Sequence, residues 1–286
     1  MRKDKKNRWL VMAVVAVLAF SGCGAGTEGV ELASAEEYMQ AAKTALEGKD
    51  SYTAAFEAVV SMNGAGNMTT KGKITFVEEP LFMQVDTNLL FEDGRQKYTL
   101  YLEKAGDAVN QYMNYGGEWT EMTLQAENAM DSVQIYSAVQ NLKALLAAAE
   151  NCTLQTEGKQ AVISAEIPAE KLYDVEEAGR FFQMAGMSSL SAVYFEGVGA
   201  TPVTFVLNQK TGEPLSYEID LTKPLEKVTN NVLAELDGGN GVSVKAYRLS
   251  YQLTKLGGVK AGGVPAEAKS NAINYEREIS ILEGEK

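Results

Sequence analysis

The sequence contains no histidine and only two cysteines among its 286 residues. Histidine is the commonest general base near neutral pH, the commonest zinc ligand and a member of most nucleophilic triads. Its absence argues against triad hydrolases and against zinc enzymes. We therefore expect no catalytic residues, no metal site and no cofactor, although the many carboxylates leave acid and base chemistry open on composition alone.

The sequence also lacks the motifs of serine hydrolases, penicillin-binding proteins and P-loop enzymes, and the G-x-G-x-x-G pattern of Gly24, Gly26 and Gly29 lacks the preceding strand that a dinucleotide-binding loop needs. Residues 186 to 190, Gly-Met-Ser-Ser-Leu, come near a G-x-S-x-G elbow but end in leucine, and no histidine exists to activate the serine. Neither S-x-x-K nor G-x-x-x-x-G-K-[ST] occurs, which argues against a penicillin-binding protein and a P-loop enzyme. The sequence therefore predicts a protein that is not an enzyme.

No apolar run is long enough to cross a membrane as a helix. The longest, Trp9 to Phe20, has 12 residues, and as a helix it would reach about 18 Å of the roughly 30 Å hydrocarbon core. Five basic residues precede it, which is the pattern of a signal peptide.

The run ends in Phe20-Ser21-Gly22-Cys23, which resembles the bacterial lipobox, where the cysteine receives a lipid and becomes the mature N-terminus. We expect lipidation at Cys23 and an extracytoplasmic protein anchored to the cell membrane by that lipidated cysteine. The alternative is an ordinary secretory signal cleaved nearby. With Cys23 lipidated, Cys152 has no partner for an intramolecular disulfide.

The mature chain is strongly acidic. Removing residues 1 to 22 takes away five of the 26 basic residues and one of the 38 acidic ones, which leaves a net charge of −16. Such a surface repels phosphate backbones and anionic head groups, so we expect no nucleic-acid partner and membrane contact only through the lipid. The predicted organisation is a signal peptide (1–22), a lipidated cysteine with a flexible tether (23–33), one domain (34–275) and a charged tail (276–286).

The first half of the domain is predicted to be a short helix followed by an antiparallel meander. Ser34 and Glu37 form a capping box for a helix that ends near Gly48. From Tyr52 the apolar residues alternate with period two, as in strands with one buried face, and turn residues such as Asp93-Gly94 separate them. The expected strands include residues 52–62, 74–76, 81–91, 98–102, 109–115 and 118–124.

The second half is predicted to contain helices and further hairpins. One long helix is expected from Asn128 to Glu150, because apolar residues recur at spacings of four and three and form a face that covers the sheet. An amphipathic helix that includes Phe182 should follow Pro168, and a shorter helix should span 224–236. The expected strands are 152–157, 161–167, 203–208, 215–222 and 247–253.

The strands carry more large apolar residues than these helices can cover. With 11 Met and 13 Tyr in the chain, a curved sheet closed by helices would enclose an adaptable apolar groove. We take the inward stripe of the third strand as its lining, with Met83, Val85, Leu89 and Phe91 as ligand-binding residues. The alternative is that these residues simply fill the core.

Together these features resemble the LolA-like lipoprotein fold, which includes LppX-like and LprG-like lipid-binding lipoproteins, and they most resemble uncharacterised Gram-positive cell-surface lipoproteins. The likeness rests on the lipobox at Cys23, the strand-turn-strand from Tyr112 to Trp119, and the Val264-Pro265 segment followed by Ala272. It implies an α+β fold, a curved antiparallel half-barrel sheet covered by a few helices.

The resemblance also implies a membrane-anchored, non-enzymatic lipoprotein that binds an apolar or lipid-like ligand. The alternative function is a cell-envelope module that holds or senses a protein partner and has a fully packed interior. An apolar cavity of several hundred cubic ångströms would favour the ligand, and a filled half-barrel would favour the partner.

Overall fold

The computed structural model describes residues 32–64, 66–188, 190–236 and 241–274. These residues belong to one compact unit, Glu31–Lys286, and a separate unit, Met1–Val30, lies outside them. Cys23 and the predicted signal peptide and charged tail therefore fall outside the described residues.

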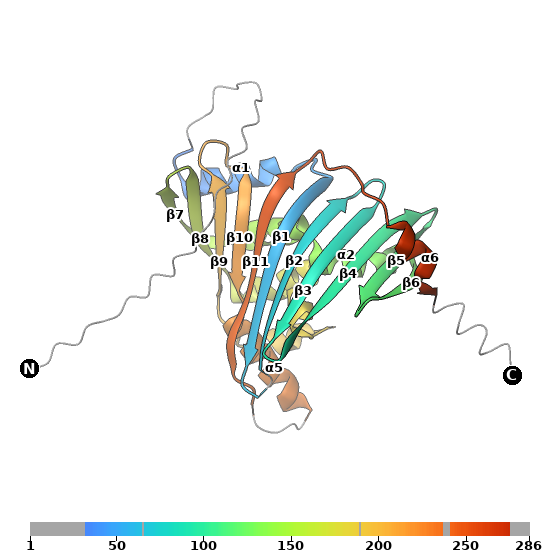
Figure 1. Cartoon of the computed structure of the whole chain (residues 1–286). Coiled ribbons are helices and arrows are strands. Elements are labelled where there is room, and N and C mark those ends of the chain that lie inside the picture. The colour runs from blue at the N-terminus through green and yellow to red at the C-terminus, as the bar shows by residue number, and fades with distance from the viewer. Residues whose placement is uncertain (1–31, 65, 189, 237–240, 275–286) are drawn as a thin grey trace, which may run out of the picture. The chain divides into compact units, whose positions relative to one another are not determined.

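One open sheet of 12 strands organises the described residues, in the order β12-β6-β5-β4-β3-β2-β1-β11-β10-β9-β8-β7 (Figure 1). The strands are β1 (Ser51–Met62), β2 (Gly66–Val77), β3 (Phe82–Phe91), β4 (Gly94–Ala105), β5 (Ala108–Tyr115), β6 (Glu118–Gln125), β7 (Glu150–Glu157), β8 (Gln160–Ile167), β9 (Thr201–Asn208), β10 (Pro214–Asp220), β11 (Val244–Leu256) and β12 (Ile273–Asn274). Neighbouring strands run antiparallel except β12, which pairs in parallel with β6.

The two meanders join where β1 pairs with β11, although these strands lie far apart in the sequence. Phe56 of β1 faces Tyr251 of β11 across the strand pair, with ring centroids 5.9 Å apart. This long-range pairing turns two local hairpin arrays into one continuous curved sheet. Alternation and turn residues predict the strands and their neighbours within each meander, but not the pairing of β1 with β11.

Most of the helices lie on one face of the sheet, behind it in Figure 1. They are α1 (Ala35–Ala45), α2 (Ala126–Tyr136), α3 (Ala138–Ala148), α4 (Leu172–Gly179), α5 (Thr222–Glu235) and α6 (Ala266–Asn271), with three short 3-10 turns, η1 (Ala169–Lys171), η2 (Phe181–Ala185) and η3 (Ala192–Phe195). Among these described helices, α6 differs because it packs on the outer face of the sheet. The fold is therefore α+β, an antiparallel sheet covered by a few helices, as predicted.

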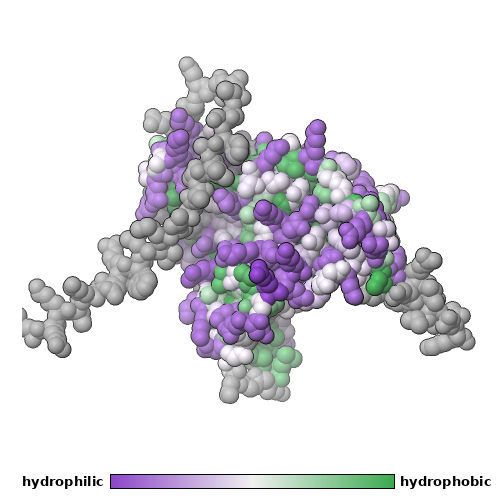
Figure 2. All heavy atoms as spheres, viewed as in Figure 1, coloured by the Kyte–Doolittle hydropathy of each residue, from purple (hydrophilic) through white to green (hydrophobic). Residues whose placement is uncertain are grey.

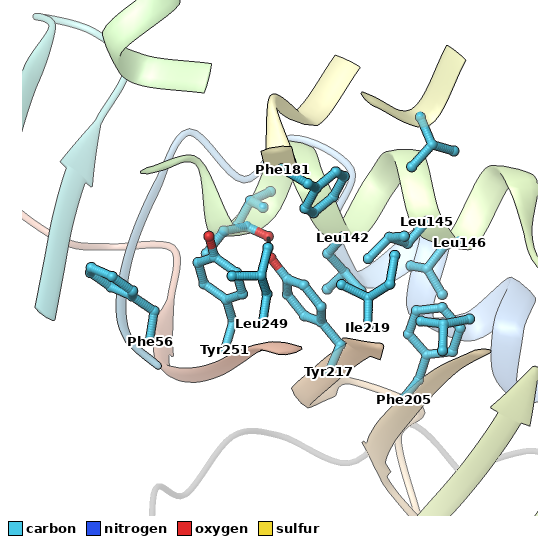
Figure 3. Close-up of a cluster of buried hydrophobic side chains, with 14 of the residues drawn as sticks. Phe56, Leu142, Leu145, Leu146, Phe181, Phe205, Tyr217, Ile219, Leu249 and Tyr251 are labelled. Carbon is cyan, nitrogen blue, oxygen red and sulfur yellow. Dashed lines mark hydrogen bonds between the residues drawn. The ribbon is translucent and has the colours of Figure 1, made fainter. Parts of the chain in front are cut away.

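The main core lies between the inner face of the sheet and helices α1 to α5 (Figure 3). Tyr217 and Tyr251 stack at 4.9 Å between ring centroids, and the Tyr217 hydroxyl donates to the carbonyl of Ala138 at 2.8 Å. Tyr217 thus keeps its polar tip bonded to the helix layer while its ring fills the core.

A smaller core forms on the outer face, where the chain after β11 returns across the sheet to β6. Val264 and Ala268 of this segment are buried with Phe82, Tyr101 and Tyr112. Trp119 packs beside Tyr101 at 6.1 Å between centroids. The rest of the outer face seen in Figure 2 is mostly hydrophilic or neutral, which agrees with the alternation of polar residues along the strands.

Most of the predicted elements are confirmed, and two helices need correction. The capping box of Ser34 and Glu37 is formed. The single long helix predicted over 128–150 is instead two, α2 and α3, because Ser137 leaves the helical conformation (ψ 90°) and caps α3 by accepting from Gln140 N. The helix after Pro168 ends at Gly179, before Phe182, because Arg180 adopts a left-handed conformation (φ 50°).

Candidate functional site

A cavity of about 720 Å³ opens between the sheet and the helix layer. Its lining comes from the ends of β2, β4 and β5, from the chain between β2 and β3, and from α2, α3 and α4. This volume falls in the roughly 300 to 1,000 Å³ range of small-molecule sites.

The sheet side of the cavity is apolar. Phe76 of β2, Leu81 before β3 and Val109 of β5 line it. Phe76 points inward because it alternates with outward residues of β2 and pairs with Met83 on the inner face of β3. The period-two pattern that makes these strands therefore also builds this wall.

The helix side combines apolar and polar residues. Ala126, Met130, Val133 and Gln134 recur along one face of α2, since residues three and four apart lie on the same side of a helix. The Oε1 atom of Gln134 is buried and has no hydrogen-bond partner among the described residues. The break between α2 and α3 adds Ser137 to the lining, so the break itself shapes the site.

Charged side chains stand at the opening of the cavity. Glu78, Lys104 and Asp107 line it and are exposed to solvent. Lys104 Nζ lies 3.2 Å from Glu79 Oε1, so the one cation among the described lining residues already has an anionic partner. The rim therefore carries a surplus of negative charge.

The four predicted ligand residues do not line this cavity. Met83 and Val85 are 0% exposed within the main core, which matches the alternative that they fill it. Leu89 is half-buried, and Phe91 is 42% exposed near the β3–β4 turn. Ligand binding at these four residues stays a prediction.

The sequence alone gives little indication of which residues line the cavity. Phe76 and Leu81 belong to the alternating pattern that predicts the strands, but they flank a turn, and nothing in the pattern shows that the helix above them leaves a gap. Ser137, where the helix breaks, lines the cavity, but the apolar stripe from 135 to 149 predicts an unbroken helix at that point. Locating the cavity therefore required the tertiary structure.

The acidic side chain most perturbed by burial lies beside the cavity wall rather than in it. Burial raises the pKa of Glu176 to about 8, although N–H donation from Phe182 and the nearby Arg180 charge oppose this change. Its two carboxyl oxygens accept from Phe182 N at 3.3 and 3.1 Å. Glu176 is in α4, two residues before the cavity-lining Ala178, and we assign it a structural role as a cap for η2.

Other chemistry is sparse in the part of the chain that the structure describes. Within those residues, no group of three or more potential ligands is placed to hold a metal ion, and no helix is long and apolar enough to span a membrane. Burial raises the pKa of the Cys152 thiol, helped by the nearby Glu36 charge, which disfavours the reactive thiolate.

Residues 34–273 match a family described as "Family of unknown function (DUF6612)". The chain belongs to this DUF6612 family. The match covers the same stretch that forms the sheet and its helices, so the whole described fold is the family domain. No curated protein is detectably similar to the chain in sequence.

Two solved structures are similar to this DUF6612 protein over most of its length. One is LprF from Mycobacterium bovis, with 13% identity, a TM-score of 0.45, and coverage of 81% of this chain and 97% of the other. The second is the LolA superfamily protein NE2245 from Nitrosomonas europaea, with 8% identity, a TM-score of 0.24, and coverage of 82% and 97%. Likeness at this level does not bear on what the protein binds.

Proposed function

We propose that this protein is an extracytoplasmic, non-enzymatic lipoprotein, anchored to the cell membrane through Cys23, that binds an apolar or lipid-like ligand. The observation that carries the proposal is the cavity of about 720 Å³ between α2 and the inner face of the sheet. Nine of its 15 lining residues are apolar or glycine, and the six polar ones include the three charged residues at the opening. A mainly apolar wall with a limited set of polar groups is the usual character of a small-molecule site.

Burial of a hydrocarbon chain can supply the affinity. At about 0.8 kcal/mol per buried methylene, a chain of some 16 carbons gains roughly 13 kcal/mol before the costs of association. Those costs amount to about 4 to 15 kcal/mol and are lowest for a pre-formed cavity. A cost of about 5 kcal/mol leaves about 8 kcal/mol, which corresponds to binding in the micromolar range.

The test is a titration of the soluble form of the chain from Gly24, which lacks the lipidated cysteine and contains every described residue. The probe is an uncharged dye that fluoresces in apolar surroundings. Ala178→Trp fills the cavity from an exposed position of α4, so it should block binding with little effect on folding. Ala147→Trp, at an exposed position of α3 that does not line the cavity, is the matched control.

We expect saturable binding in the wild type and in Ala147→Trp, and its loss in Ala178→Trp. No saturable binding in a protein shown to be folded would favour the alternative, an envelope module that recognises a protein partner. Equal binding in all three proteins would place the ligand elsewhere on the chain.

A further inference from the structure

We propose that the ligand of the cavity is an amphiphile whose polar group donates hydrogen bonds and carries no negative charge. This inference rests on the proposed function and narrows it to a ligand class. Two separate observations support it, the charges at the opening and an unpaired acceptor in the wall.

The first observation is the charge balance at the opening. Glu78 and Asp107 line the cavity with no ion pair to a described lysine or arginine, whereas Lys104 is held by Glu79. Three carboxylates therefore face one ammonium at this end of β2 and β4. A carboxylate or phosphate head group would meet net repulsion here, while an uncharged or cationic head group would not.

The second observation is the Gln134 side chain on α2. Its Oε1 is buried without a partner among the described residues, and the residue lines the cavity. A buried acceptor left unpaired is costly, and a ligand hydroxyl or N–H would remove that cost. Ser137 also lines the cavity and accepts from Gln140 N and from the Tyr52 hydroxyl, but it forms no hydrogen bond with Gln134 Oε1.

The two features select for the same head-group chemistry. The carboxylates at the opening disfavour a negatively charged head group. The unpaired Gln134 oxygen in the wall favours a head group that donates a hydrogen bond over one that only accepts. The apolar residues Phe76, Leu81 and Val133 line the remainder of the cavity, where a hydrocarbon chain would be buried. A monoacyl glycerol has this combination, with hydroxyl donors, no charge and one chain.

The experiment compares three amphiphiles with the same chain, hexadecyltrimethylammonium, monohexadecanoyl glycerol and hexadecanoate, as competitors of the uncharged dye at neutral pH. Exposed charges each change binding only a few-fold, so we expect the cationic and uncharged amphiphiles to bind about tenfold more tightly than hexadecanoate. The preference for the cation should weaken as salt is added.

The charge argument is tested with Glu78→Gln/Asp107→Asn, which should reduce the discrimination against hexadecanoate to about twofold or less. The matched control is Glu157→Gln/Glu213→Gln, which removes the same charge from the end of β7 and from the loop between β9 and β10. Both positions are distant from the cavity in the sheet order. If both double variants change the preference equally, the net charge of the protein explains it and the rim argument is wrong.

The acceptor argument is tested with Gln134→Met, which keeps the shape of the side chain and removes the amide. This variant should bind the monoacyl glycerol several-fold more weakly than the wild type does. Its affinity for hexadecyltrimethylammonium, which has no N–H or O–H donor, should be unchanged. Equal weakening of both would contradict the assigned hydrogen bond. Tight binding of hexadecanoate would overturn the ligand class while leaving the cavity as an apolar site, whereas binding of none of the three would reject the proposed function itself.

Discussion

Replacing Glu176 with glutamine should change how the stability of the protein depends on pH. The side chain is 6% exposed, and burial raises its pKa from an ordinary 4.5 to about 8. Between these two values the folded protein keeps a proton that the unfolded chain has lost. The free energy of unfolding should therefore fall as pH rises through this window, with the contribution of Glu176 fully lost above pH 8.

The magnitude follows from the same two pKa values. When the folded state binds one proton more than the unfolded state, the free energy of unfolding falls by about 1.4 kcal/mol per pH unit. Glu176 therefore lowers the free energy of unfolding by roughly 4 kcal/mol between pH 5 and pH 8. Glutamine keeps an oxygen that can accept from Phe182 N and removes the titration. Glu176→Gln should therefore lose this part of the pH dependence and become more stable than the wild type at pH 8.

The assay is urea unfolding of both proteins at several pH values from 5 to 8, with the free energies compared at equal m-values. The matched control is Asp174→Asn, which removes a carboxylate from an exposed position of the same helix. A difference between wild type and Glu176→Gln that stays constant with pH would refute the assignment of a buried, protonated carboxyl.

Four further outcomes are expected. Cys23→Ser should release the protein from membranes, and unchanged membrane retention with no loss of acyl mass would contradict lipidation. Leu142→Ala, at a position 0% exposed in α3, should lower the unfolding free energy by about 2 to 5 kcal/mol in urea titrations. Gly72→Ala should destabilise by about 1 to 3 kcal/mol or more, because its Cβ would lie within 2.2 Å of the Phe56 ring and 2.8 Å of Asp86 O. EDTA should leave the thermal midpoint unmoved, and a shift of several degrees would reveal a metal site.

The sequence pattern predicts the local elements well because their causes are local. Alternation from Tyr52 identifies β1, and the capping box at Ser34 identifies α1, since each depends on residues within a few positions. The break at Ser137 is different. Ser137 accepts a hydrogen bond from Gln140 N in the next helix and another from the Tyr52 hydroxyl of a distant strand. Because the second contact is tertiary, local sequence patterns do not predict the break.

The site was harder to predict than the fold for the same reason. Met83 and Val85 point inward as predicted, but they are packed within the main core, and both side chains are 0% exposed. The cavity lies further along the sheet, at Phe76 and Leu81. Periodicity shows which face is buried, and only the packing of helices shows where that face is left open.

The central claim is that this cavity holds an apolar molecule, and native mass spectrometry of the soluble form from Gly24 after mild purification tests it most directly. We predict a bound species of lipid-like mass that organic solvent removes, that persists in Ala147→Trp, and that is missing in Ala178→Trp. A folded wild-type protein that carries no adduct and acquires none when incubated with a monoacyl glycerol would contradict the claim.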